Sequence, residues 1–282
     1  MVTPAARRHA VGYLREAHII SQRRACRLLG ACRATVRYVC RTTDNDVLAE
    51  RLGVLARQWP RFGYRRLHLL LRREFGTLNH KRVYRLYRNA GLAVRRNRRK
   101  RAALPRQPLP VATRPGEMWS MDFMRDTLAS GRAFRTLNVL DVVTRECLAI
   151  EVDTSLPGQR VARVLDGIAA ERGLPTTIRV DNGPEFAGKA LDAWAYQNGV
   201  ALDFITPGKP IENAHVESFN GRFRDECLNV HWFSTIVDAR GVIADWQRDY
   251  NAVRPHSALG NQPPAVFAQL LRSTAGLSEC LD

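Results

Sequence analysis

The sequence predicts an α/β domain, a mixed five-stranded sheet with helices on both faces, preceded by two all-helical modules. Apolar, strand-forming stretches begin after residue 116, and the helical spacing of apolar residues dominates before residue 93. Three strands in sequence, followed by alternating helices and strands, favour a mixed sheet. The expected strands are 117–124, 134–143, 147–152, 176–180 and 200–205. The expected helices of this domain are 157–172, 185–198, 211–228 and 237–250.

Changes of composition divide the chain into five segments. Residues 1–43 and 44–92 read as a helix-turn-helix module and a second helical DNA-binding module. Residues 93–115 hold a run of basic residues and four prolines, which is typical of a linker. The expected catalytic α/β core is 116–270, and the expected C-terminal tail is 271–282.

The excess of positive charge is confined to the first part of the chain. Residues 1–115 contain 28 Lys and Arg against 5 Asp and Glu, a charge of +23, whereas residues 116–282 contain 16 against 22, a charge of −6. Such self-repulsion destabilises a compact domain unless a polyanion relieves it. Almost all of these cations are arginines, which favour bidentate phosphate contacts. We therefore expect the first part to bind nucleic acid rather than to carry a merely solvated basic surface.

The first module contains a helix-turn-helix pattern between Gln22 and Val39. Small Ala25 occupies the first helix, Gly30 permits the turn, and Val36 points inward from the second helix. The second helix of such a motif enters the major groove with its N-terminal side chains. Here these are Arg33, Thr35 and Arg37. A plain three-helix bundle with a solvated arginine face is the alternative interpretation.

The second module shows three amphipathic segments between Leu48 and Gly91. Its last helix, expected at 79–89, turns Val83 and Tyr87 inward and its basic residues outward. Arg82 and Arg85 are the DNA-binding candidates on that outer face. The interleaved tyrosines and arginines suit a nucleic-acid surface, and they equally suit a core beneath a solvated face.

The six cysteines show no zinc-ligand pattern, because none forms a C-x-x-C pair or stands beside a histidine at zinc-finger spacing. They are expected to be ordinary thiols in a reducing cytosol. No charged-then-apolar leader opens the chain, and no apolar run approaches the roughly 18 residues of a membrane span. The expectation is a soluble, cytoplasmic protein without a membrane partner.

Two aspartates of the predicted core are candidate functional residues because of their positions in or just after its strands. Asp122 lies inside an apolar strand, where an ionised carboxylate is costly unless it is paired or bound to a metal. A strand-edge residue facing water is the alternative, and Asp126 is a rival candidate. Asp181 follows the strand at 176–180, at the end where open α/β sheets bind ligands. Asp-Asn-Gly is also an ordinary turn sequence.

A glutamate on the following helix completes the set of candidates. Glu217 lies on a polar helix face, for which a solvated surface is the alternative, with Glu212 and Glu226 as rivals. The residues that share its face at helical spacing are Asn213, Asn220 and Arg224. A few open carboxylate ligands suit Mg²⁺ or Mn²⁺. Two such ions about 4 Å apart stabilise the attacking and leaving oxygens of a phosphoryl displacement.

Several motifs occur in order around these residues. They are Val-Asp-Asn-Gly-Pro-Glu-Phe at 180–186, Pro-Gly-Lys-Pro at 207–210, Asn-Ala at 213–214, Glu-Ser-Phe at 217–219 and Tyr-Asn, Arg-Pro-His-Ser and Leu-Gly between 250 and 260. The chain resembles the OrfB transposases of two-frame bacterial insertion sequences over almost its whole length. The 35 residues between Asp181 and Glu217 are similar to the D,D(35)E spacing of these enzymes and of retroviral integrases. Glu212 and Asn261 depart from the family pattern without touching the three carboxylates.

The resemblance implies an RNase H-like catalytic core and a DDE-type polynucleotidyl transferase that cleaves and transfers DNA strands. It implies that Asp122, Asp181 and Glu217 are catalytic and hold two Mg²⁺ ions, for which Mn²⁺ can substitute, and that Arg224 contacts the transposon end. The implied partners are the terminal inverted repeats, the target DNA and further copies of the chain on DNA. The implied location is the bacterial nucleoid. The family often adds an upstream-frame protein by fusion, and no heptad zipper is visible here.

Two other functions fit the same residues. The first is a non-catalytic DNA-binding regulator that retains an integrase-like core as a dimerisation body. The second is a metal-dependent nuclease of RNase H type, which hydrolyses strands but joins none. A metal-dependent strand-transfer assay separates all three.

Overall fold

The computed structural model describes residues 3–38, 45–94, 112–183, 186, 188–206 and 213–278. The chain forms two compact units, Met1–Glu50 and Arg51–Asp282. Val39, Cys40, most of the basic linker, Pro184, Glu185 and 207–212 lie outside the described residues, as does Cys280. No helix within the described ranges is long and apolar enough to cross a membrane.

The first unit contains the three short helices that the sequence predicts. They are α1 (Pro4–His18), α2 (Gln22–Leu28) and α3 (Arg33–Arg37). The Ser21 hydroxyl accepts a hydrogen bond from the Arg24 amide and caps α2. Gly30 adopts a positive φ of 56° in the turn before α3, where a residue with a Cβ would be strained. Val11, Ala25 and Cys26 form the buried centre.

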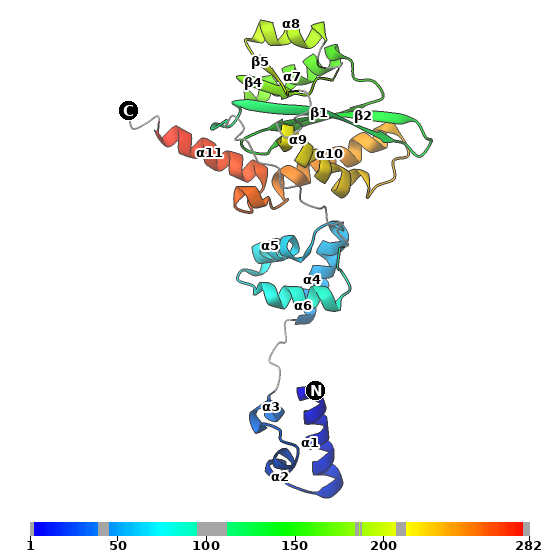
Figure 1. The fold of residues 1–282 in the computed structure, drawn as a ribbon, viewed down its shortest axis with the longest axis vertical. Coiled ribbons are helices and arrows are strands. Elements are labelled where there is room, and N and C mark those ends of the chain that lie inside the picture. The colour runs from blue at the N-terminus through cyan, green and yellow to red at the C-terminus, as the bar shows by residue number, and fades with distance from the viewer. Residues whose placement is uncertain are drawn as a thin grey trace. The chain divides into compact units, whose positions relative to one another are not determined.

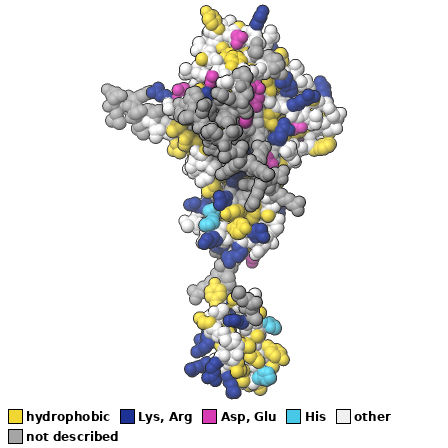
Figure 2. All heavy atoms as spheres, viewed as in Figure 1, with side chains coloured by type: hydrophobic (Ala, Val, Ile, Leu, Met, Phe, Trp, Pro, Cys, Tyr) yellow, Lys and Arg dark blue, Asp and Glu magenta, His cyan; other side chains and the backbone are white. Residues whose placement is uncertain are grey.

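Arginine side chains cover the outside of this unit. Between residues 3 and 38 they face a single acidic residue, Glu16. The exposed arginines are Arg7, Arg8, Arg15, Arg23, Arg24, Arg27, Arg33 and Arg37. Figure 2 shows dark-blue Lys and Arg side chains gathered over this unit. The unpaired positive charge predicted from the sequence is therefore displayed at the surface, where it is available to a polyanion.

Three further helices follow, α4 (Asn45–Gln58), α5 (Tyr64–Phe75) and α6 (His80–Asn89). Leu67 and Leu71 of α5 and Val83 of α6 are fully buried, as the helical spacing of apolar residues predicts. Asn79 caps α6 by accepting a hydrogen bond from the Lys81 amide. We refer to α5, the turn after it and α6 as the α5–α6 module.

The predicted mixed five-stranded sheet is confirmed (Figure 1). Its strands are β1 (Met118–Thr127), β2 (Ala133–Asp141), β3 (Cys147–Asp153), β4 (Thr177–Val180) and β5 (Ala201–Phe204). Their spatial order is β3-β2-β1-β4-β5. The pairs β1–β2 and β2–β3 are antiparallel, whereas β1–β4 and β4–β5 are parallel. β1 is the central strand, with an antiparallel neighbour on one side and a parallel neighbour on the other.

Helices cover both faces of the sheet (Figure 1). On one face, α7 (Gly158–Arg172) and α8 (Lys189–Asn198) pack over Met121 and Val180. On the other face, α9 (Ala214–Phe223) and α10 (Ile236–Ala252) pack over Met124 and Phe134. Alternate residues of β1 therefore belong to different cores, which fixes the face to which each polar residue on this strand is directed.

Two parts of the core differ from the sequence prediction. The helix expected at 211–228 is α9 followed by a π-helical turn, η2 (Arg224–Leu228), and the wider turn rotates the helical faces that follow it. After a short 3₁₀ turn, η3 (Ser257–Leu259), the chain forms α11 (Pro264–Ser278). The sequence pattern predicts no such helix, and the tail expected at 271–282 instead begins within α11. Ala268 of α11 is buried, so its packing holds the helix in place.

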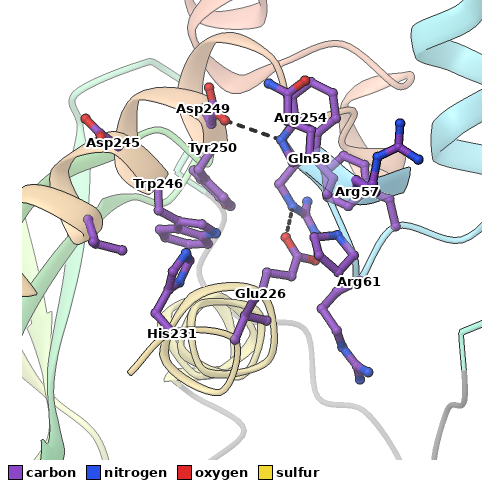
Figure 3. Close-up of a pocket in the computed structure, with 15 residues that line it drawn as sticks. Arg57, Gln58, Arg61, Glu226, His231, Asp245, Trp246, Asp249, Tyr250 and Arg254 are labelled. Atoms are coloured by element: carbon purple, nitrogen blue, oxygen red, sulfur yellow. Dashed lines mark hydrogen bonds and ion pairs between the residues drawn. The ribbon is translucent and has the colours of Figure 1, made fainter. Parts of the chain in front are cut away.

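A buried ion-pair network joins the α5–α6 module to the α/β domain. Glu226 of η2 is 7% exposed, and its carboxylate accepts from Arg66 of α5 and from Arg254 after α10, each at 2.7 Å. Figure 3 shows Glu226 and Arg254 directed toward one another. The Trp59 indole also donates to Asp249 of α10. Because Glu226 lies nine residues beyond Glu217, this network attaches the module to the continuation of the helix that carries Glu217.

We expect Glu226→Gln to lower the free energy of unfolding of the second unit by about 3 kcal/mol, because two guanidiniums then lose a buried counter-charge. All five tryptophans lie beyond residue 50, so tryptophan fluorescence during urea unfolding reports this unit alone. The matched control is Asp245→Asn, which breaks an exposed pair with Arg248 whose side chains are 70% and 74% exposed. That change should cost less than about 1 kcal/mol. Equal losses would contradict a special role of the buried network.

Candidate active site

Helix α9 lies along β1, and three hydrogen bonds hold the two elements in register. Each bond joins a residue on the polar face of the helix region to β1. The Ser120 hydroxyl donates to the side-chain oxygen of Asn213 at 2.5 Å, and the Asn220 amide donates to the Asp122 carboxylate at 2.7 Å. The Arg224 guanidinium donates to the Arg125 carbonyl at 3.0 Å. Asn213, Asn220 and Arg224 of the predicted polar face are therefore turned toward the sheet, whereas Glu217 on the same face is exposed.

The spacing of these bonds follows from the geometry of helix and strand. Eleven residues at a helical rise of 1.5 Å cover about 16 Å, and five residues of a strand at about 3.3 Å cover nearly the same distance. Glu217 is four residues beyond Asn213, about 6 Å along the helix. Asp122 is two residues beyond Ser120, about 7 Å along the strand. The match places Glu217 at the level of Asp122, on the helix face that meets β1.

The parallel pairing of β1 and β4 places the third carboxylate. Ser120 is aligned with Arg179, and two further residues in the same register bring Asp181 level with Asp122. Neighbouring strands lie about 4.8 Å apart. Ile178 and Val180 belong to the core beneath α7 and α8, so the alternate residues of β4 face α9. The carboxyl end of β4 thus delivers Asp181 to the side of the sheet on which Glu217 lies.

The electrostatics of Asp122 show that the three groups occupy one neighbourhood. Burial, as the largest cause, and the carboxylates of Asp181 and Glu217 together raise the pKa of the Asp122 carboxyl to about 6, against the hydrogen bonds that it accepts from the Phe123 amide and Asn220. Burial also raises the pKa of Glu217. Asp122 and Asp181 are half-buried and Glu217 is exposed, and a cation between these mutually repelling carboxylates would lower the cost of their charges.

The three carboxylates are near one another without forming a finished metal cage. Among the described residues, no three His, Cys, Asp or Glu side chains are close enough together to ligate one ion. Like charges repel one another at ligand distance unless a cation lies between them. The donor set fits a hard divalent cation, because all three members are carboxylates on adjacent elements.

Buried polar groups beside Asp122 support the same assignment. Asn138 lies on β2, directly opposite Asp122 on β1, and its side-chain amide donates to Asn220 at 2.7 Å. Asn138 Oδ1 and the nearby Thr136 hydroxyl are buried and have no hydrogen-bond partner among the described residues. Such groups in a native fold call for a bound water or ion. The sequence analysis missed Asn138, although a polar residue within an apolar strand was a usable signal.

The loop after Asp181 is a tight turn anchored by an aromatic residue. The Gly183 amide donates to the Asp181 carboxylate at 3.0 Å, so the turn interpretation of Asp-Asn-Gly is correct as well. Phe186 is buried and stacks on Phe123 of β1 with ring centroids 4.8 Å apart. This stacking ties the loop to the strand that carries Asp122.

The predicted DNA-binding residues occupy different settings. Arg33, Thr35 and Arg37 are exposed on α3, where Arg37 donates to Gln22, and Arg85 is exposed on α6. Arg82 of α6 is half-buried. Arg224 donates to the Arg125 carbonyl, so at least one of its guanidinium nitrogens holds α9 to β1. His215 is half-buried beside Arg145 and Arg179, and burial together with these cations lowers its pKa to about 4, so it is neutral at physiological pH.

This topology, with carboxylates carried by β1, β4 and α9, defines the class of integrase catalytic cores with an RNase H-like fold. Two family models described as "Integrase core domain" match residues 112–210 and 198–264. One described as "HTH-like domain" matches residues 44–101, which include the α5–α6 module. A simian T-cell lymphotropic virus intasome, solved in complex with PP2A regulatory subunit B56 gamma, aligns with a TM-score of 0.51. It covers 77% of this chain and 74% of its own at 14% identity, which shows the shared fold.

Curated relatives identify the particular family. The chain is 52% identical over 264 residues to the 31.7 kDa protein of insertion element IS407 from Burkholderia multivorans, covering 93% of this chain and 95% of the relative. It is 27% identical over 259 residues to transposase InsD of insertion element IS2D from Escherichia coli, covering 86% and 84%. The chain belongs to the insertion-sequence transposases, which confirms the resemblance and the fold class predicted from the sequence. Membership implies a polynucleotidyl transferase of DNA transposition, and the integrase core family uses divalent metal.

Replacing Asp122 by Asn should stabilise the second unit at neutral pH. The pKa of the Asp122 carboxyl is about 6 in the folded chain, against an ordinary value of 3.8. Keeping this carboxyl ionised therefore destabilises the folded state, and this cost reaches its full size above a pH of about 6. A two-unit shift corresponds to about 3 kcal/mol. After solvent screening and the loss of one hydrogen-bond acceptor, roughly 1–2 kcal/mol should remain. Urea unfolding at pH 7.5 should show this gain, and it should shrink as the pH is lowered toward 4.

The control is Asp126→Asn on the same strand, where the carboxylate likewise accepts from the following amide, that of Thr127. That variant should show no comparable gain. An Asp122→Asn protein with wild-type stability throughout this pH range would show that Asp122 carries no such electrostatic cost.

Proposed function

We propose that this chain cleaves DNA at the ends of an insertion sequence and transfers the ends to target DNA, with Asp122, Asp181 and Glu217 as its catalytic residues. One observation carries the proposal: the register of α9 and β4 against β1 brings these three carboxylates to one side of the sheet. The raised pKa of Asp122, to which both other carboxylates contribute, supports it.

The three carboxylates would hold two Mg²⁺ ions, and Mn²⁺ can substitute for them. When bound, these cations supply activation of the attacking oxygen and neutralisation of the leaving oxygen. Without a bound cation, the pKa of Asp122 is about 6, and a bound cation would favour its anionic form. Asn213 and Asn220 act as positioning residues, since they fix the helix that presents Glu217.

The reaction consists of two phosphoryl displacements at this site. In the first, water attacks a phosphodiester at the element end, the bond from phosphorus to the 3′ oxygen breaks, and a 3′-hydroxyl is released. In the second, that hydroxyl attacks a target phosphodiester and displaces the target's own 3′ oxygen. The number of phosphodiester bonds is unchanged in the second step, and no serine or tyrosine intermediate is needed. The protein contributes placement and charge.

The basic helical parts would hold the DNA. Arg33, Thr35 and Arg37 of α3, and Arg82 and Arg85 of α6, are the proposed contacts to the terminal inverted repeats. Arg224 can reach the transposon end only with guanidinium nitrogens other than the one bound to Arg125. Both ends of the element must be joined to the target in one event, so we propose that the chain forms a homo-oligomer on DNA. An upstream-frame protein is a further proposed partner.

The test is a strand-transfer assay with labelled inverted-repeat ends and a plasmid target. With Mg²⁺ or Mn²⁺, the wild-type protein should give joined products, and a chelator should abolish them. Asp122→Asn, Asp181→Asn and Glu217→Gln should each reduce joining at least about 10³-fold, the scale of losing a main electrostatic contributor to a transition state. Binding of the ends, measured in chelator, should stay within about threefold of wild type.

Asp126→Asn is again the control and should retain joining, since it lies on β1 away from the level of Asp181 and Glu217. A fully active Asp181→Asn protein would refute the assignment of the site. End binding without any joining by the wild-type chain would identify a DNA-binding regulator instead. Hydrolysis without joining would identify a nuclease.

A further inference from the structure

A basic groove lies between the α5–α6 module and the end of the catalytic core, within the second unit. It encloses about 960 Å³. Its walls come from α5, α6, Ala93–Val94, one residue of α9 and the segment from Arg254 to Asn261. Five arginines line it: Arg65, Arg66, Arg88, Arg222 and Arg254. No Asp or Glu is among its described lining residues. The groove is therefore a concave surface of one charge sign.

Carboxylates outside the groove compensate its positive charge only in part. Arg66 and Arg254 share a single carboxylate, that of Glu226. Arg222 donates to the Ser218 carbonyl of its own helix, and burial together with Arg254 lowers its pKa. Arg88 is exposed at the end of α6. Placing an anion in the groove would offset this repulsion, and phosphate is the anion that arginine clusters recognise best.

A buried histidine in the groove wall lacks hydrogen-bond partners. His256 is 4% exposed, and neither of its ring nitrogens has a partner among the described residues. Burial and the guanidiniums of Arg222, Arg254, Arg145 and Arg66 lower its pKa to about 3, so the ring is neutral and has one donor and one acceptor nitrogen. A buried polar side chain without a partner calls for a ligand, and a nucleotide can supply both acceptors and donors.

Two tyrosine rings, tilted at 56° to one another, form a second element of the wall. The rings of Tyr64 on α5 and Tyr84 on α6 are 4.8 Å apart between centroids, and Tyr84 is 44% exposed. The Arg65 guanidinium lies 6.0 Å from the Tyr64 ring. Exposed aromatic rings interleaved with arginines are the platform on which unpaired bases stack, while the arginines contact the phosphates.

The dimensions of the groove select a single strand. Its volume lies within the range of about 300–1,000 Å³ that accommodates ligands of drug size, which corresponds to a few nucleotides and not to a duplex. Arg222 lies five residues beyond Glu217, which is about 7.5 Å along the helix axis. Arg222 is also turned by about 140° around the helix from Glu217, so the groove lies close to Glu217 along the helix axis but on a different side of the helix.

We propose that this groove binds an unpaired stretch of DNA strand, with phosphates against Arg65, Arg88 and Arg222 and a base stacked on Tyr84. The groove would hold a strand that has separated from its complement beside the reacting end. Only this link to the reacting end rests on the function proposed above, because binding in the groove requires no metal.

The test is fluorescence anisotropy of the full chain with a labelled single-stranded oligonucleotide of about 12 nucleotides, and separately with duplex DNA, both in chelator. Tyr84→Ala should weaken single-strand binding by roughly 5- to 150-fold, the range that one stacked base contributes, and Tyr84→Phe should restore it. Arg88→Ala should weaken it by at least about fivefold. Both alanine variants should bind duplex DNA within about twofold of wild type.

Two controls remove the same groups outside the groove. Tyr196→Ala removes a 90% exposed tyrosine from α8, and Arg72→Ala removes an exposed arginine from α5. Both should bind single strands normally. Asp122→Asn should also bind normally, so loss of catalysis and loss of the groove are separable. As a second measurement, photocrosslinking of a strand containing 5-iododeoxyuridine should label the peptides that carry Tyr84 or His256.

Equal weakening of single-strand and duplex binding would overturn the proposal, because the groove would then be part of a general basic surface. Wild-type single-strand affinity in folded Tyr84→Ala and Arg88→Ala proteins would overturn it as well. Crosslinks found only in the first unit, Met1–Glu50, would also overturn the proposal.

Discussion

The site depends on the alignment of one helix with one strand. Asn213 and Asn220 bind Ser120 and Asp122, and because eleven helical residues span about the same length as five strand residues, Glu217 reaches the level of Asp122. The parallel pairing of β4 then adds Asp181. Two regular structures of different rise thus place residues from three distant parts of the chain together. The free energy that the charged cluster costs is offset by the packing of Phe219 and Phe223 into the core beneath α10.

Local patterns were sufficient to predict most of the fold. Strand-forming stretches gave all five strands, and the helical spacing of Leu67, Leu71 and Val83 gave α5 and α6, because burial imposes these periods on any sequence. The π-helical turn η2 was not predictable, since it preserves the composition of the helix that it interrupts. Nor was α11, whose support comes from distant contacts. For the site, residue type, spacing and the family resemblance proposed Asp122, Asp181 and Glu217. Asn138 and Glu226 could not be proposed in this way, because their hydrogen-bond partners lie 82 and 28 residues away in the sequence.

The network around Glu226 gives the Tyr-Asn and Arg-Pro-His-Ser motifs a structural meaning. Arg254 pairs with Glu226 and lies 5.5 Å from the Tyr250 ring, and Asn251 bonds both the amide and the carbonyl of Cys147 on β3. The segment therefore joins the sheet, the helix region beyond Glu217 and the α5–α6 module. If DNA binds to that module, as proposed above, the ion pairs of Glu226 connect it to the helix region that follows Glu217. Such a connection suits an enzyme whose chemistry must follow recognition of the correct end.

Convergence of the three carboxylates on a cation is the central claim, and iron-directed cleavage measures it directly. Fe²⁺ occupies Mg²⁺-type carboxylate sites and, with ascorbate and peroxide, cuts nearby backbone. The account predicts fragments that end near residues 122, 181 and 217 in one wild-type sample, which disappear with excess Mg²⁺ and in Glu217→Gln. Cuts near only one of these residues, or cuts that neither Mg²⁺ nor Glu217→Gln affects, would contradict it.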